Sequence, residues 1–119
     1  KMHISLAHQG EWAAVILHPR KSVGIDLETP SPKIDRIAPR LFSEKELHWA
    51  DTPERRCMIW CAKEALYKWY GKRGLFFKED LQIARFSLQN PLEAEVKGTA
   101  VQINTRRLQE TQAVFCLAV

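Results

Sequence analysis

The chain has 119 residues, a net charge of +4 and an isoelectric point of about 9.1. Hydrophobic residues make up 45% of it and charged residues 27%, which is typical of a globular protein that folds as one domain over residues 1–119. No apolar run approaches the roughly 18 residues of a membrane span. The basic residues are scattered and no nucleic-acid recognition motif is present, so nucleic-acid binding ranks last among the functions that the charge allows.

The three cysteines are Cys57, Cys61 and Cys116. An odd number of cysteines without an export signal favours reduced thiols, and therefore a cytoplasmic protein. No second Cys/His pair accompanies Cys57 and Cys61 to complete a zinc site. We therefore expect these cysteines to be small buried hydrophobic residues.

The first 30 residues are expected to form strands. Residues 3–8 mix polar and apolar side chains, residues 12–17 have the pattern of a buried strand, and residues 22–28 have that of a second strand. The turn at residues 18–22 predicts that these last two strands form a hairpin. Prolines at positions 30 and 32 end the second strand, because proline cannot extend a strand ladder.

Three helices are expected next. Apolar residues at helical spacing predict a helix over residues 33–42. Ser43 and Glu46 match a capping box, which opens a short helix through residue 49. A long helix is predicted to run to residue 70. Thr52 can cap its start, and Pro53 suits its first position.

The rest of the chain is predicted to be a meander of strands over residues 81–88, 92–97, 100–104 and 113–119. Turns are expected at residues 90–91 and 97–98. The order of hairpin, helices and meander predicts an α+β domain in which an antiparallel sheet packs against the long helix.

The long helix carries a group of polar residues beside its apolar stripe. Trp60, Glu64 and Lys68 share one face, with Lys63 and Tyr67 next to them. These residues suit a metal and phosphate site. Taken alone, they fit better an ordinary helix surface, where a Glu–Lys pair four residues apart stabilises the helix.

Two further carboxylates lie two residues apart on the predicted strand over residues 22–28. Asp26 and Glu28 should project together, while Ile25 and Leu27 face the core. Neighbouring carboxylates repel each other and need a cation, an arginine or solvent. If strand and helix pack together, Asp26, Glu28 and Glu64 can supply oxygen ligands to Mg²⁺.

The same residues resemble the paired signature of the 4′-phosphopantetheinyl transferases. That signature is a Gly-aliphatic-Asp-x-Glu strand, here residues 24–28, followed by a Trp-x-x-Lys-Glu-Ala-x-x-Lys helix, here residues 60–68. Three other segments are similar to family motifs in the same order: the Ser/His segment at 4–8, the Arg-Leu-Phe-Ser-x-x-Glu run at 40–46 and the glycine loop at 71–75.

The resemblance implies a reaction and a set of site residues. The 4′-phosphopantetheine of coenzyme A would be transferred to a serine of an acyl or peptidyl carrier protein. Asp26, Glu28 and Glu64 would bind magnesium, and Glu64 would also be the candidate base. Lys63 and Lys68 would steady the pyrophosphate, and His8 would contact a phosphate of coenzyme A.

The order of the motifs implies a subtype. Because the Ser/His segment precedes the Asp strand, the chain resembles the C-terminal lobe of the larger, two-lobed surfactin-synthetase-activating type. The resemblance therefore implies that a second lobe or subunit is needed to complete the coenzyme A site. The alternative is a non-catalytic lobe that binds a carrier protein or a partner subunit. Neither the carrier protein nor the oligomeric state follows from the sequence.

Overall fold

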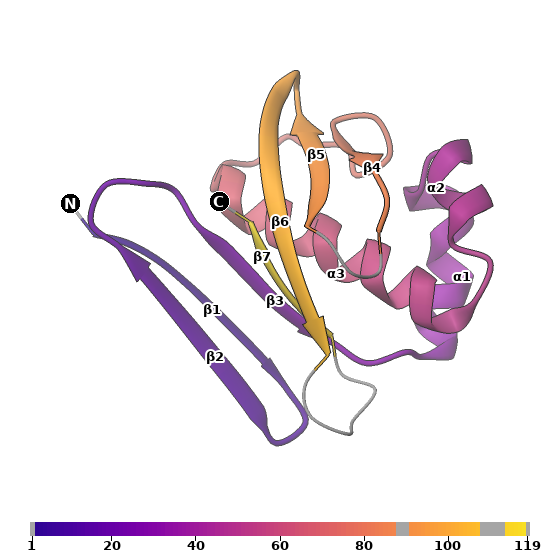
Figure 1. Ribbon diagram of the computed structural model, residues 1–119, viewed down its shortest axis with the longest axis horizontal. Coiled ribbons are helices and arrows are strands. Elements are labelled where there is room, and N and C mark those ends of the chain that lie inside the picture. The colour runs from indigo at the N-terminus through magenta and orange to yellow at the C-terminus, as the bar shows by residue number, and fades with distance from the viewer. Residues whose placement is uncertain (1, 88–90, 108–113, 119) are drawn as a thin grey trace.

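The computed structural model describes residues 2–87, 91–107 and 114–118, the last segment by its backbone alone. Its elements are β1 (His3–Gln9), β2 (Trp12–His18), β3 (Gly24–Glu28), α1 (Pro32–Leu41), α2 (Glu44–Trp49), α3 (Pro53–Tyr70), β4 (Leu81–Arg85), β5 (Leu92–Val96), β6 (Thr99–Arg107) and β7 (Val114–Ala118). Five strands form an antiparallel sheet in the order β3–β7–β6–β5–β4. Figure 1 shows α3 crossing this sheet and the β1–β2 ribbon lying beside β3. Helices α1 and α2 lie near the end of α3 that is farther from the ribbon. The predicted α+β architecture is confirmed.

Helices α2 and α3 begin where the predicted capping signals place them. Ser43 and Glu46 form both bonds of the predicted capping box, and the Thr52 hydroxyl accepts a hydrogen bond from the Arg55 amide at the start of α3. Gly71 ends α3 in the left-handed conformation with φ of 71°. None of the described helices is long and apolar enough to cross a membrane.

The core has two parts on opposite sides of β3. The larger part lies between α3 and the sheet and includes Cys57 and Cys61, so the expectation that these cysteines are buried is confirmed. The smaller part contains Ile25 and Leu27, both 3% exposed, packed against the β1–β2 ribbon. The side chain of Cys116 lies outside the described residues, as do the predicted strand ends at 88, 113 and 119 and the turn residue Asn90.

The predicted hairpin between residues 12–17 and 22–28 is wrong. β2 pairs instead with β1, through a two-residue loop at Gly10 and Glu11 that follows the Gln9–Trp12 pair. Gly10 has φ of 58°, a conformation that short hairpin loops require. β3 pairs with β7, the last strand of the chain, so its partner is nearly 90 residues away in sequence.

Candidate functional site

The site is built where β3 crosses α3, and Gly24 permits that crossing. A Cβ atom at position 24 would lie 2.0 Å from the carbonyl oxygen of Ala65 and 2.5 Å from the amide nitrogen of Trp69. Only glycine allows strand and helix backbones to approach so closely. The crossing places Asp26 and Glu28 beside the middle of α3.

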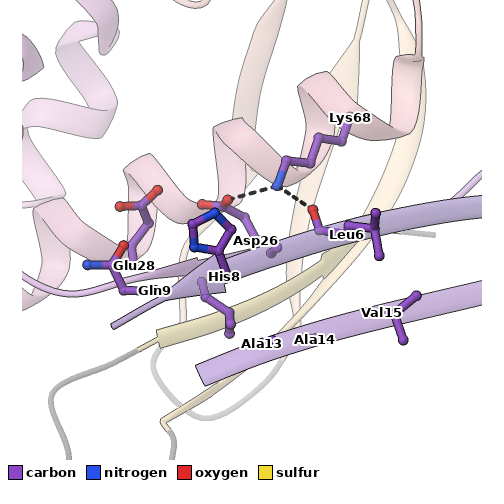
Figure 2. A pocket seen from close by; sticks show the side chains of 11 residues that line it. Leu6, His8, Gln9, Ala13, Ala14, Val15, Asp26, Glu28 and Lys68 are labelled. Atoms are coloured by element: carbon purple, nitrogen blue, oxygen red, sulfur yellow. Dashed lines mark hydrogen bonds and ion pairs between the residues drawn. The ribbon is translucent and has the colours of Figure 1, made fainter. Parts of the chain in front are cut away.

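Lys68 of α3 joins both strand layers at this crossing. Its amino group donates hydrogen bonds to the carbonyl oxygens of Leu6 in β1 and Ile25 in β3, each 2.9 Å away. It also forms an ion pair with Asp26 Oδ1 at 3.1 Å, drawn in Figure 2. Lys68 therefore contacts the strand that carries Asp26 and Glu28. Three oxygen atoms of the chain surround its positively charged amino group.

The three predicted carboxylates influence one another. Burial, together with the neighbouring carboxylates of Asp26 and Glu64, raises the pKa of Glu28 to about 8, against an opposing effect of Lys33. Burial, and then the charge of Asp26, also raises the pKa of Glu64, while Lys68 and Lys33 lower it. Burial and mutual repulsion therefore both disfavour the ionised forms of Glu28 and Glu64.

The residues of this cluster fit a magnesium ion. Asp26 is 6% exposed, and its Oδ2 is a buried oxygen with no hydrogen-bond partner among the residues that the structure describes. Carboxylate oxygens are the ligands that Mg²⁺ prefers, and a cation would relieve both the unpaired oxygen and the repulsion with Glu28. Within the described ranges, no three acidic, histidine or cysteine side chains already have the arrangement of a formed metal centre.

A pocket of about 620 Å³ opens between β3 and the β1–β2 ribbon. Asp26, Glu28 and Lys68 form its charged end, and His8 lies beside them on β1 (Figure 2). The remainder of its lining is mostly apolar and comes from both strands of the ribbon and from Leu27 of β3. Four of the predicted site residues therefore line one pocket, and Glu64 lies close enough to interact electrostatically with three of them, Asp26, Glu28 and Lys68.

Lys63 does not join this site. Its side chain is 0% exposed, and its amino group forms an ion pair with Glu46 Oε1 at 2.7 Å. It also donates to the carbonyl oxygens of Phe77 at 2.6 Å and Leu81 at 2.7 Å. In this structure Lys63 therefore cannot steady a pyrophosphate beside Lys68, because its amino group is enclosed by three oxygens elsewhere.

Sequence reasoning missed the roles of Glu46 and Ser5. The sequence predicts Glu46 only as a cap of α2, whereas it is also the buried partner of Lys63. Ser5 is 6% exposed, and its hydroxyl accepts a hydrogen bond from the Ile25 amide at 3.0 Å, which fastens β1 to β3. No local pattern marks Glu46 as the partner of Lys63, but a serine between apolar residues on a strand signals a buried hydrogen bond.

Comparison with known proteins agrees with this geometry. The chain is 31% identical over 80 residues to a Haemophilus influenzae protein named "Putative 4'-phosphopantetheinyl transferase"; the match covers 60% of this chain and 34% of that protein. The chain thus spans about a third of the length of this relative. The family model of the 4′-phosphopantetheinyl transferase superfamily matches residues 22–118, a range that contains β3, α3 and the clustered carboxylates. The chain therefore belongs to the 4′-phosphopantetheinyl transferase superfamily.

Proposed function

We propose that this chain transfers 4′-phosphopantetheine from coenzyme A to a serine hydroxyl of an acyl or peptidyl carrier protein, in a magnesium-dependent reaction. The observation that carries the proposal is the crossing of β3 and α3. It brings Asp26, Glu28 and Lys68 into one pocket with Glu64 in electrostatic reach. Family membership supports the same reaction.

The transfer breaks a P–O bond of the coenzyme A pyrophosphate and forms a P–O bond to the serine oxygen. Adenosine 3′,5′-bisphosphate leaves. Magnesium, bound by Asp26, Glu28 and Glu64, would offset negative charge on the pyrophosphate. Lys68 supplies a second positive charge at the same end of the pocket, and His8 a polar contact for a phosphate.

The serine proton needs an acceptor, and Glu64 suits this role. Its pKa is raised by burial, so its carboxylate has a greater proton affinity than an exposed glutamate. Trp60 and Tyr67 lie on the same face of α3 as Glu64 and are themselves partly buried against the core. Lys68 near the carboxylates would favour the ionised form that accepts the proton.

The test is the mass of a carrier protein after incubation with this chain, coenzyme A and magnesium. Addition of one phosphopantetheinyl group is expected. Asp26→Ala and Glu64→Gln should lower the rate by at least about 100-fold, whereas Glu54→Gln, an exposed glutamate on the same helix, should leave it unchanged. Unmodified carrier from a folded protein would contradict the proposal, and equal rates in all variants would contradict the site.

We further propose the two-lobed, surfactin-synthetase-activating type, in which a second lobe or subunit completes the coenzyme A site. The outward face of the β1–β2 ribbon supports this. Ile4 and Leu17 are cross-strand partners, as are Leu6 and Val15, and all four side chains are 56–64% exposed. Contiguous exposed apolar residues mark interaction surfaces, and this surface continues into the pocket.

Ile4→Gln and Leu17→Gln test the second lobe, because neither residue lines the pocket. Sedimentation should show loss of the assembled form, and coenzyme A affinity should fall by about tenfold or more. Unchanged mass and affinity would contradict this proposal. A chain that binds a carrier protein through this face, but neither binds coenzyme A nor modifies the carrier, would support the alternative of a non-catalytic lobe.

A further inference from the structure

Glu46 and Lys63 form a buried ion pair that has no direct part in the proposed reaction. Both side chains are 0% exposed. Beyond their mutual contact, Glu46 accepts hydrogen bonds from the amides of Ser43 at 2.7 Å and Ile83 at 2.8 Å. Because Lys63 holds the carbonyl oxygens of Phe77 and Leu81, the pair connects α2, α3 and the segment that leads into β4.

The helical geometry of α3 places Lys63 on a different side of the helix from the site residue Lys68. At about 100° per residue, Lys63 and Lys68 lie roughly 140° apart around the helix. Tyr67, Trp60 and Glu64 follow one another between them on the same arc. Lys63 and Glu64 are adjacent in the sequence, but their side chains leave the helix in directions about 100° apart and therefore have different neighbours.

Phe77 covers the part of this arc that separates Lys63 from Glu64. Its ring lies 5.5 Å from the Trp60 ring and 5.4 Å from the Tyr67 ring, measured between centroids. Asp26 of β3 lies on the other side of Glu64, where it pairs with Lys68. Glu64 is therefore flanked by β3 on one side and by the aromatic cluster of Trp60, Tyr67 and Phe77 on the other.

We propose that Glu46 and Lys63 are positioning residues for Glu64. Their ion pair fixes the Phe77 carbonyl, and this holds the Phe77 ring in the aromatic cluster that borders Glu64. Lys63 thus acts on the site through Phe77 rather than through coenzyme A. The catalytic consequence rests on the proposed function, whereas the fastening of the 77–81 segment is a property of the fold and is tested separately.

Hydrogen exchange tests the fastening without any substrate. Glu46→Gln keeps the size of the side chain but removes the charge that Lys63 needs, so amides of residues 74–81 should exchange at least about tenfold faster than in the parent protein. Glu44→Gln, an exposed glutamate of the same helix, is the matched control and should leave exchange unchanged. Equal exchange in both variants would overturn the proposal.

Phe77→Leu provides a second variant that leaves the ion pair intact. It removes the ring from Trp60 and Tyr67, so the intrinsic fluorescence of Trp60 should change as it does in Glu46→Gln. If Glu46→Gln fails to fold, the Phe77→Leu variant still decides whether the aromatic cluster affects Glu64. Normal kinetics in folded Phe77→Leu would then overturn the positioning role.

Kinetics separate positioning from direct contact. Positioning predicts that Glu46→Gln, Lys63→Met and Phe77→Leu each lower kcat by at least about tenfold and change KM for coenzyme A by less than about threefold. A direct role of Lys63 predicts a raised KM in Lys63→Met alone, which would refute the proposal. If the parent protein transfers nothing, the proposed function fails, and the exchange measurement still decides whether the ion pair fastens residues 77–81.

Discussion

Gly24→Ala tests the strand–helix crossing on which the whole site depends. The added methyl group would lie 2.0 Å from the Ala65 carbonyl oxygen, whereas such contacts essentially never fall below 3.0 Å. β3 and α3 must therefore separate by about 1 Å, since neither clashing backbone atom can rotate away. We expect the free energy of unfolding to fall by about 3 kcal/mol, the upper part of the range for overpacked cores.

The same displacement should reach the site. Asp26 Oδ1 and Lys68 Nζ are 3.1 Å apart, and a separation of about 1 Å would take them beyond hydrogen-bond distance. We therefore expect Gly24→Ala to lose magnesium-dependent transfer even at temperatures where it is folded. A stability effect alone would leave the rate of the folded fraction unchanged.

Urea denaturation measures the stability effect, with Gly10→Ala as the control. Gly10 has φ of 58°, and a Cβ atom added there would have no atom within 4 Å, so this variant carries only the conformational cost of about 1 kcal/mol. Gly24 has no positive φ, so its cost comes from contact alone. A Gly24→Ala variant that is as stable as Gly10→Ala would refute the close approach of β3 and α3.

Three further predictions concern the site. Without magnesium, the folded state binds more protons than the unfolded state as Glu28 titrates, because its pKa is about 8 against 4.5, so the free energy of unfolding should fall as pH rises from 4.5 to 8. Since Glu28 is only half-buried, we expect this decrease in the free energy of unfolding to be about 1–2 kcal/mol. In urea denaturation at a series of pH values, Glu28→Gln should remove the dependence on pH, and a dependence that persists would refute the assignment of this effect to Glu28. Lys68→Met should lower stability by about 2 kcal/mol, because it leaves the buried Asp26 carboxylate unpaired, and an unchanged denaturation midpoint would contradict this. Ser5→Ala should cost about 1–2 kcal/mol by leaving the Ile25 amide without its acceptor, whereas an effect as small as that of an exposed serine would contradict the role of this bond in joining β1 to β3.

Local chemistry made the helices predictable. The caps of α2 and α3 depend on residues three positions apart, so Ser43, Glu46 and Thr52 marked their starts without any tertiary information. The period of two along β3 likewise placed Asp26 and Glu28 on the face opposite to Ile25 and Leu27. The residues of the carboxylate site could therefore be identified in advance, helped by their resemblance to the family.

Strand pairing could not be read in the same way. β3 is closer in sequence to β2 than to any other strand, yet it pairs with β7, because pairing depends on which strands can cover a common core. The ribbon of β1 and β2 closes through its own two-residue loop and packs on β3 face to face, which no local pattern reveals.

Lys63 and Lys68 of α3 show most clearly what the sequence determines and what the tertiary structure determines. The sequence alone determined that Lys63 and Lys68 lie on one helix and point about 140° apart, since this follows from helical geometry. Only the tertiary structure decided which of them meets the carboxylates. The absence of a side chain at Gly24 lets β3 settle on the Lys68 side of α3, and the buried Glu46 holds Lys63 on the other. These contacts join residues 17 to 42 positions apart, and their geometry exists only once the chain has packed.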